Sequence, residues 1–419
     1  MAKPITVAAP TRPRRLPFYA LLAAQAISFA GNALAGLALP WFVLQTSGSA
    51  ARVGLVAFCA LLPQVLAATF GGAFVDCLGH RRASVVADLA SGIATMLVPL
   101  LYAFGWLNFG LLLALVFGGA LLDAPGATAR AALFPEVIGL ARFRPERANT
   151  AHEIVESGAG FAGPLLAGVL IAILGPTLVL WGNAASFFLS ALLVLGCVPT
   201  MRGAALMGDS ASYRDTLARG FRFVLRDPPI RSIFVIGAPL NFLIAPLFAV
   251  ILPFSIQTSG DNALGLGATV GAFGGGAVLG AIVYGAVGHR WSRRRTFLVG
   301  VFAIGGSFAV VAALPPVPIM IAALFLSGLI SGPNGPMITT IVQERTPPAL
   351  RGSVFGATTA IGFAGGPLGV LLAGASLQTI GTRPTLLGAT ALFLVVALAL
   401  TFDSGLRELD RPLSSPIER

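Results

Sequence analysis

The sequence predicts an all-α integral membrane protein with twelve transmembrane helices, arranged as two six-helix bundles. Three observations support this fold class: the composition, the number of long apolar runs, and the recurrence in the second half of segments from the first. Of the 419 residues, 56% are hydrophobic and only 10% are charged, whereas a soluble domain carries about 25% charged residues. The composition therefore excludes a water-soluble protein, and we expect a lipid bilayer around most of the chain.

The apolar runs set the number of spans, because a transmembrane helix needs about 20 consecutive apolar residues. In the first half, such runs fall at about residues 17–44, 52–75, 83–104, 108–134, 149–174 and 178–199. In the second half, they fall at about residues 230–256, 264–287, 296–313, 318–340, 354–376 and 384–402. The even number of runs predicts that both ends of the chain lie on one side of the membrane.

The positions of the basic residues predict the orientation of these spans. Of the 27 basic residues, 26 are arginines, and nearly all lie in the terminal segments or in the even-numbered connections. The odd-numbered connections contain only Arg52 and Arg383. Because loops rich in arginine stay in the cytoplasm, we expect cytoplasmic N- and C-termini. The net charge of +11 then follows from topology, and we expect no nucleic-acid partner.

The polar segments divide the chain into five parts. We expect a cytoplasmic tail at 1–16, a bundle at 17–199, a cytoplasmic linker at 200–229, a second bundle at 230–403 and a tail at 404–419. Within the linker, Leu217, Phe221 and Val224 share one helical face and arginines surround the other,. This pattern predicts an interfacial helix that ties the bundles together; the alternative is a solvated basic linker.

Segments of the two halves match in the same order. The run GAFVDCLGHRR begins at Gly72 and GAVGHRWSRRR begins at Gly285, and their Gly, Ala and closing Arg pair align without a gap. The run GFAG occurs at 160 and again at 362, followed each time by proline and LLAG. More weakly, Glu136 of the fourth span matches Glu344 of the tenth. Matches in one orientation predict parallel repeats about an axis along the membrane normal, as in two-bundle secondary transporters.

The connection at 72–82 resembles the signature loop between spans two and three of the major facilitator superfamily. Its matching positions are Gly72, Asp76, Gly79, Arg81 and Arg82, whereas Cys77 and His80 stand where the signature has arginine. The resemblance implies that Asp76 acts as a conformational latch, which accepts hydrogen bonds in the outward-open state and releases them in the inward-open state. The alternative is a charge cluster that merely keeps the loop in the cytoplasm.

Further stretches extend this resemblance over about residues 17–403. The segment Gly163-Pro164-Leu-Leu-Ala-Gly168 is similar to the antiporter signature of span five, with Ala167 in place of one glycine. The stretches QAISFAGNALAGLALPWFVLQTSGSA, LARGFRFVLRDPP and TPPALRGSVFG look like the branch that contains enterobactin-type and macrolide-type exporters, although Asn32 stands where that branch often has an acid. The resemblance implies alternating access of two bundles about a central cavity, with export driven by a gradient.

Ionisable residues inside the spans are candidates for coupling, because each is costly in the bilayer. Asp123 lies 13 residues before Glu136, near the middle of the membrane, and Arg130 follows two turns later on the same face,. We interpret Asp123 as a proton or cationic-substrate site. The alternative is a structural pair with a neighbouring helix near Pro125.

Glu153 and Glu156 lie on one face at the start of the fifth span and are further candidates for sharing a proton,. The alternative for both is a favourable position in the first turns of a helix. We expect Asp88 to pair with the arginines of the 72–82 loop. Spans seven to ten contain no acid before Glu344, so proton coupling is expected in the amino-terminal bundle.

Polar, uncharged residues within the spans are candidates for the wall of a substrate cavity. They are Gln25, Asn32 and Gln64 in the first bundle and Asn241, Tyr284 and Asn334 in the second. The alternative for each is a hydrogen bond between helices.

The function predicted from these residues is secondary active transport, most simply proton-coupled export of a hydrophobic or amphiphilic small molecule such as a drug or siderophore. We expect a monomer in a bacterial-type inner membrane, without cofactor or metal. An uncoupled facilitator or importer is the alternative. An integral-membrane lipid enzyme is a remote one, because His80, His152 and His289 have no metal-ligand spacing and the three cysteines are scattered,.

Overall fold

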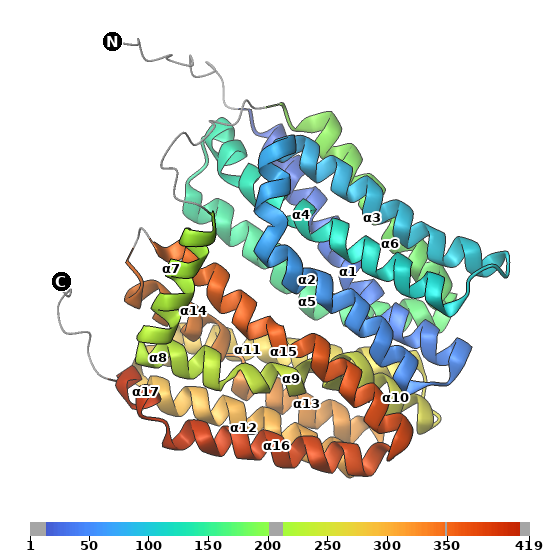
Figure 1. Ribbon diagram of the computed structural model, residues 1–419, viewed down its shortest axis with the longest axis vertical. Coiled ribbons are helices and arrows are strands. Elements are labelled where there is room, and N and C mark those ends of the chain that lie inside the picture. Colours follow the sequence, from blue (N-terminus) through green and yellow to red (C-terminus); the bar gives the residue numbers. More distant parts are fainter. Residues whose placement is uncertain (1–13, 201–212, 348–349, 411–419) are drawn as a thin grey trace.

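The computed structural model describes residues 14–200, 213–347 and 350–410, without the side chains of 67–77, 213–217 and 289. All regular structure in these ranges is helical. The amino-terminal half contains α1 (Leu16–Ser47), α2 (Ala50–Leu78), α3 (His80–Ala103), α4 (Phe109–Ala141), α5 (Pro145–Leu174) and α6 (Pro176–Cys197). Figure 1 shows these helices in one bundle, beside a second bundle made by the carboxy-terminal half.

The second bundle begins with one span built from several helical segments. These are α8 (Pro228–Arg231), η1 (Ser232–Ile236), α9 (Ala238–Pro246), η2 (Leu247–Ile251) and α10 (Leu252–Thr258). The remaining elements are α11 (Ala263–Val287), η3 (Gly288–Arg290), α12 (Arg293–Ala312), α13 (Val317–Ser331), α14 (Asn334–Arg345), α15 (Arg351–Thr379), α16 (Thr382–Phe402), α17 (Ser404–Arg407) and η5 (Glu408–Asp410).

Eleven helical stretches in the described part of the chain are long and apolar enough to cross a membrane. The first part of α2, Ala50–Leu66, is apolar but shorter. The spans expected at 230–256 and 318–340 are each interrupted. Two π-helical segments, η1 and η2, widen the first, and a turn at 332–333 separates α13 from α14 in the second.

Short connections join neighbouring helices at two ends of the molecule. The described chain begins and finishes at the same end, which we call the terminal end; α7 and α17 lie there in Figure 1. The other end, which we call the opposite end, holds turns such as Gly48 after α1 and Gly175 after α5. Both glycines have positive φ, at 63° and 80°, a backbone conformation that costs glycine little.

The linker helix α7 (Tyr213–Arg226) packs on the carboxy-terminal bundle. Val224 is fully buried in a small apolar cluster with Ile230, Val342 and Val354, and Phe221 packs against it. The side chain of Leu217 lies outside the described residues. The last described residues also fold back: Leu406 and Leu409 of the segment expected to be a tail are buried against this bundle.

The two halves make matching contacts at the terminal end. His80 Nδ1 lies 2.8 Å from Glu136 Oε1, and Arg293 Nη1 lies 2.6 Å from Glu344 Oε2. In the repeat alignment, His80 corresponds to Arg293 and Glu136 to Glu344. The next residues match as well, because Arg81 donates to the Leu195 carbonyl at the end of α6 and Arg294 donates to the Thr401 carbonyl at the end of α16.

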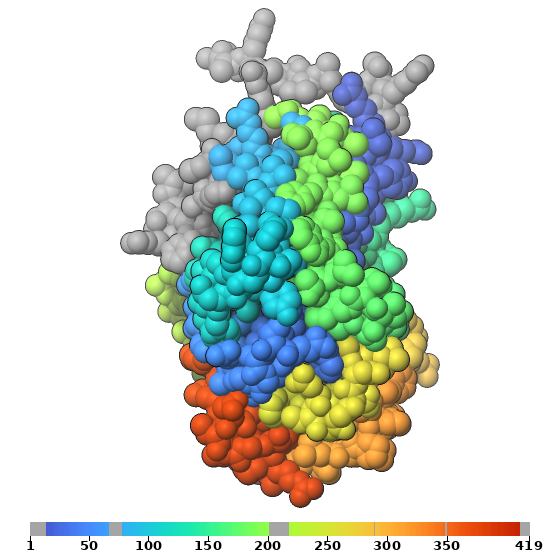
Figure 2. All heavy atoms as spheres, turned by 90° about the vertical axis from the view of Figure 1, so that its right-hand side faces the viewer, coloured from blue at the N-terminus to red at the C-terminus, as the bar shows by residue number. Residues whose placement is uncertain are grey.

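Glycines bring the two bundles together at the opposite end. A methyl group on Gly54 of α2 would lie 2.6 Å from the Val370 carbonyl oxygen of α15, and one on Gly168 of α5 would lie 2.8 Å from the Ala263 carbonyl oxygen of α11. Viewed from this end, the halves meet along a seam (Figure 2). Only residues without a side chain permit so close an approach.

The same helices separate toward the terminal end. Phe161 of α5 still contacts Gly275 of α11. Two turns farther along the same faces, Ile154 is 66% exposed and Ile282 is 62% exposed. The bundles are therefore closed against each other at the opposite end and parted at the terminal end.

Candidate functional site

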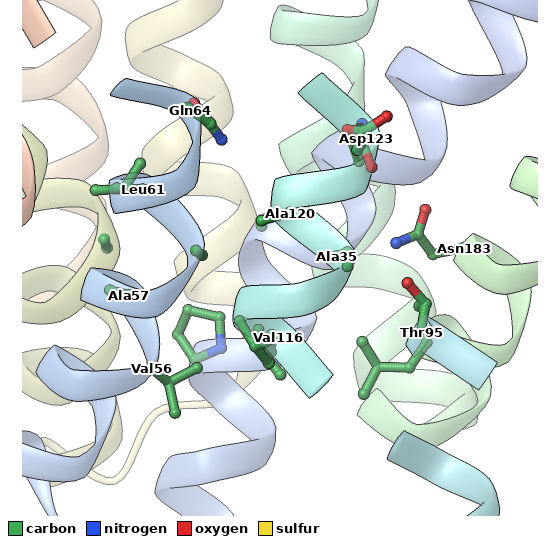
Figure 3. A pocket seen from close by; sticks show the side chains of 18 of the residues that line it. Ala35, Val56, Ala57, Leu61, Gln64, Thr95, Val116, Ala120, Asp123 and Asn183 are labelled. Carbon is green, nitrogen blue, oxygen red and sulfur yellow. Dashed lines mark hydrogen bonds between the residues drawn. The ribbon is translucent and has the colours of Figure 1, made fainter. Parts of the chain in front are cut away.

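A cavity of about 720 Å³ lies between the helices of the amino-terminal bundle and the first spans of the carboxy-terminal bundle. Figure 3 shows Asp123 and Gln64 near one end of it and Val56 and Val116 toward the other. Its size is in the range of small-molecule sites, which are mostly apolar with a few well-placed polar groups. The cavity is therefore the candidate substrate site.

The polar groups that the described residues contribute to the cavity wall come from the amino-terminal bundle. They are Asn32 of α1, Gln64 of α2, Thr95 of α3, Asp123 and Thr128 of α4, and Asn183 of α6. Among the described residues, the carboxy-terminal bundle contributes Ala245, Phe248, Ala249 and Val270 to the lining. The described polar groups thus lie on one side of the cavity, among apolar residues, and face an apolar side, which suits an amphiphilic molecule.

Asp123 is the charged residue among the described residues that line the cavity. It lies 14 residues after the start of α4 at Phe109, about 21 Å along the helix and near mid-span. Asn32 Nδ2 donates a hydrogen bond of 3.0 Å to Asp123 Oδ2. The other oxygen, Oδ1, is buried without a hydrogen-bond partner. The amide of Asn32 thus holds this acid from α1.

Arg130 lies behind Asp123 and away from the cavity. Its Nη2 is 3.7 Å from Asp123 Oδ1, a distance of electrostatic attraction without a hydrogen bond,. Its Nη1 donates to Asp88 Oδ1 of α3, and the arginine and Asp88 side chains are 3% and 0% exposed. Two carboxylates therefore share one guanidinium, and the direct bond goes to Asp88.

The expectation that Asp88 pairs with the loop arginines is wrong. Besides Arg130, Asp88 accepts a hydrogen bond of 2.7 Å from Ser190 of α6, and Arg130 Nη2 lies 3.4 Å from Ser28 of α1. The pair thus links α1, α3, α4 and α6. A buried ion pair of this kind is held by its hydrogen bonds, and the loss of one partner is expensive because the other charge stays buried.

The acids at the start of α5 lie apart from the cavity. Glu153 and Glu156 are exposed and do not line it. His152 Nε2 is 3.7 Å from Glu156 Oε2, while His152 Nδ1 is 3.0 Å from the Gln25 amide oxygen. The buried Gln25 therefore ties α1 to α5 and does not reach the cavity.

The polar candidates of the carboxy-terminal bundle lie away from the cavity, and two of them bind other helices. Asn241 donates to the Gly362 carbonyl at 2.7 Å and Asn334 donates to the Phe297 carbonyl at 3.3 Å. The Tyr284 ring lies 6.3 Å from the Trp291 ring near the terminal end. None of the three lines the cavity. The hydrogen bonds of Asn241 and Asn334 match the interhelical alternative, whereas the contact of Tyr284 is with the connection that follows its own helix,.

The predicted latch loop lies at the terminal end, at the junction of α2 and α3. Gly79 has φ of 77° and precedes α3. Arg81 caps α6 through the Leu195 carbonyl and the Thr200 hydroxyl, and Arg82 is exposed. The side chain of Asp76, and the surroundings of Gly72, lie outside the described residues.

The span-five motif supplies small residues at two helix crossings. Gly163 packs against Ala33 of α1, and Gly168 packs against Gly267 of α11. The Pro164 carbonyl lies 2.6 Å from the place that a methyl group on Gly267 would take. The motif therefore permits close contact of α5 with both bundles.

The cavity is also lined by residues beyond those predicted from the sequence. Thr95, Thr128 and Asn183 are polar residues inside apolar runs, and the criterion that selected Asn32 would have found them. Phe248 gave no comparable signal, because an aromatic residue in a span is usually part of the packing. Among the described residues, no group of three or more His, Cys, Asp or Glu side chains is placed to hold a metal ion.

Comparisons with known proteins identify the family. The chain is 33% identical over 406 residues to the multidrug efflux pump Tap of Mycolicibacterium fortuitum, covering 96% of this chain and 98% of that protein. It is 26% identical over 361 residues to the enterobactin exporter EntS of Citrobacter koseri, covering 85% and 84%. A crystal structure of a variant of the nucleoside transporter NupG superposes with a TM-score of 0.75 at 15% identity, covering 91% and 99%. Residues 21–370 match the family described as Major Facilitator Superfamily. The chain is thus a multi-pass membrane transporter of the Major Facilitator Superfamily, as its signature loop suggested, and its relatives include named efflux pumps.

Proposed function

We propose that this protein is a proton-coupled exporter that moves amphiphilic small molecules, typically cationic or neutral drugs, out of the cytoplasm. In this proposal, twelve helices span a bacterial-type cytoplasmic membrane, both termini are cytoplasmic and the monomer is the working unit. The relative named as a multidrug efflux pump, aligned over nearly the whole chain, supports drug export. The arginines of the even-numbered connections support the orientation,.

Asp123 is the observation that carries the proposal. Its carboxylate lies on the cavity wall, with Oδ2 held by Asn32 and Oδ1 without a hydrogen-bond partner. Such a group can hold a proton, or it can face a cation in the cavity. Because an unpaired charge in the membrane is costly, the carboxylate binds either a proton or a cationic substrate, and binding of one favours release of the other. This competition is the chemical basis of proton-for-substrate exchange.

Arg130 attracts the charged form of Asp123 but does not hold it with a hydrogen bond, so Asp123 can still exchange its proton. Its hydrogen bond goes to Asp88, and only a longer-range attraction reaches Asp123. With both acids ionised, the group of three carries a net charge of −1, and protonation of Asp123 leaves the neutral Asp88–Arg130 pair. Asp88 is therefore the structural partner and Asp123 the residue that changes its proton occupancy.

The transport cycle follows from the packing of the two bundles. With the terminal end in the cytoplasm, the parted helices correspond to a state that accepts substrate from inside. Rocking of the bundles separates the glycine crossings at the opposite end and brings the exposed faces of Ile154 and Ile282 together. In the outward-open state, Asp76 is proposed to form the latch at the α2–α3 junction.

The cavity favours a coupled drug exporter over the other candidate transporters. An uncoupled facilitator needs no ionisable group in the cavity wall. The described lining residues contain an acid and no basic side chain, so an anionic siderophore would be repelled. A cationic or neutral amphiphile is not repelled by this wall, and the acid gives the cavity a group that can couple its transport to protons.

Transport by inverted vesicles tests the proposal. Vesicles that contain the purified protein should accumulate tetraphenylphosphonium when the lumen is made acidic, because protons leaving the lumen drive the cation in. Asp123→Asn should abolish the dependence on the pH gradient. Glu153→Gln is the matched control, since Glu153 is exposed and lies outside the cavity. Unchanged gradient dependence in Asp123→Asn would refute the role of Asp123.

A further inference from the structure

Phe248 has a distinct place among the apolar residues of the cavity wall. The carboxy-terminal bundle lines the cavity with two alanines, a valine and this phenylalanine. The other aromatic lining residue, Phe187, is 3% exposed and packs against Gly92 of α3. Phe187 is therefore committed to the packing of α3 on α6, whereas the half-buried ring of Phe248 has surface left for a ligand.

A π-helical turn sets the position of Phe248. In η2, the Leu252 N–H donates to the Leu247 carbonyl five residues back. Pro246 and Pro253 flank the turn and have no N–H to donate, which disturbs the regular α-helical ladder,. A π turn fits one more residue into the turn and occurs often at functional sites.

The turn separates its side chains into two groups. Leu247, Val250 and Ile251 are 1% exposed or less and belong to the core of the bundle. Phe248 and Ala249 point to the cavity instead. The small Ala249 beside the large Phe248 leaves room next to one aromatic surface, which is the arrangement of a pocket for an apolar group.

A second aromatic ring supports Phe248 from behind. The Phe273 ring of α11 lies 5.0 Å from it, centroid to centroid, at an interplanar angle of 51°. Phe273 does not line the cavity. Tilted aromatic pairs at this separation are favourable, so the ring of Phe248 is braced before any ligand arrives.

We propose that Phe248 is the specificity-determining residue of the apolar wall, against which the hydrophobic body of a cationic amphiphile lies while its charge faces Asp123. This inference rests on the proposed function of the cavity as the export site. Asp123 then recognises charge and carries coupling, and Phe248 recognises the size and aromatic character of the apolar part. The two properties are separable by mutation.

Binding to the purified full-length protein in detergent tests the inference, with tetraphenylphosphonium as the probe. Phe248→Ala should weaken binding about tenfold, the loss expected from uncovering much of one aromatic side chain. The affinity of Phe248→Leu for the probe should fall between those of Phe248→Ala and the unmodified protein, and the affinity of Phe248→Trp should be close to that of the unmodified protein. Phe302→Ala is the matched control, because Phe302 lies on α12, is 38% exposed and does not line the cavity.

The pH dependence of transport separates this inference from the proposed function. Phe248→Ala should keep the gradient dependence of vesicle uptake at raised probe concentration, whereas Asp123→Asn loses it. If Phe248→Ala binds the probe as tightly as Phe302→Ala while Asp123→Asn abolishes coupling, the inference is wrong and the proposed function stands. If the unmodified protein binds no tetraphenylphosphonium, both the substrate class and this inference are overturned.

Discussion

At the scale of single residues, two buried acids near Arg130 differ in their hydrogen bonds, and the proposed difference in their roles follows from this. Asp88 is fully buried and receives hydrogen bonds from Arg130 and Ser190. Asp123 faces the cavity and has one oxygen without a donor. Both oxygens of Asp88 accept hydrogen bonds, which suits a structural residue. One oxygen of Asp123 accepts none, so it is available to a proton or a cation,.

Removal of either partner of the buried pair should destabilise the fold. We predict that Arg130→Met and Asp88→Asn each lower the free energy of unfolding by about 3–5 kcal/mol, because the first leaves the buried Asp88 carboxylate without its cation and the second removes the carboxylate that is hydrogen-bonded to Arg130,. The double variant should recover at least half of the loss. The measurement is reversible unfolding in mixed detergent micelles, with Glu153→Gln as the exposed control. Additive losses in the double variant would show that the two residues do not act as a pair.

Sequence alone located part of this site for a clear physical reason. Asp123, Asn32 and Gln64 stand out because polar groups in apolar runs are costly, and all three line the cavity. The partner of Arg130 was not predictable, because Asp88 approaches it only through the packing of α3 on α4. Phe248 was hidden because its apolar character matches the rest of its span.

At the scale of helices, glycine crossings decide where the bundles can touch. Gly54 with Gly374, and Gly168 with Gly267, remove the side chains at the two points where α2 meets α15 and α5 meets α11. Larger residues would collide with backbone carbonyls, which cannot swing aside. Closure of the opposite end therefore depends on these four positions.

Overpacking of one crossing should open that end. We predict that Gly168→Val reduces gradient-driven transport about tenfold, since overpacking costs about 1–3 kcal/mol in the closed state. Crosslinking of cysteines introduced at Ser49 and Gln378, whose side chains are hydrogen-bonded at 3.1 Å, should fall in parallel, in a background without native cysteines. Gly118→Val is the control, because nothing lies within 4 Å of a methyl group placed there. Equal crosslinking in both variants would contradict this account of closure.

Hydropathy predicted the positions of most spans but not their internal breaks. The runs at 230–256 and 318–340 are as apolar as the others, so their composition gives no sign of a π turn or of the turn at 332–333. Prolines at 246, 253 and 333 mark the disturbed places in retrospect. Whether a span is interrupted depends on its backbone hydrogen bonding, which a hydropathy pattern does not report.

At the scale of the whole molecule, the two halves use the same contacts to anchor their terminal-end loops. His80 with Glu136 repeats as Arg293 with Glu344, and Arg81 repeats as Arg294. The repeat seen in the sequence thus recurs as contact chemistry. Two similar bundles that touch through small residues are suited to rock against each other as rigid bodies.

Asp76 offers a test of this rocking. We predict that Asp76→Asn keeps tetraphenylphosphonium binding within about twofold but shifts the balance toward the state open at the terminal end, because an amide holds the proposed latch less strongly than a carboxylate. Maleimide labelling of a cysteine at Ile154 should then increase. Labelling that is unaltered by Asp76→Asn would leave the loop with a topological role only.

The most direct test of the central claim is proton release on substrate binding. We predict that addition of tetraphenylphosphonium to the purified, weakly buffered protein releases up to about one proton per bound cation, and that Asp123→Asn releases none while Glu153→Gln matches the unmodified protein. Binding of the cation without proton release, or release that persists in Asp123→Asn, would contradict the claim that proton and substrate compete for Asp123.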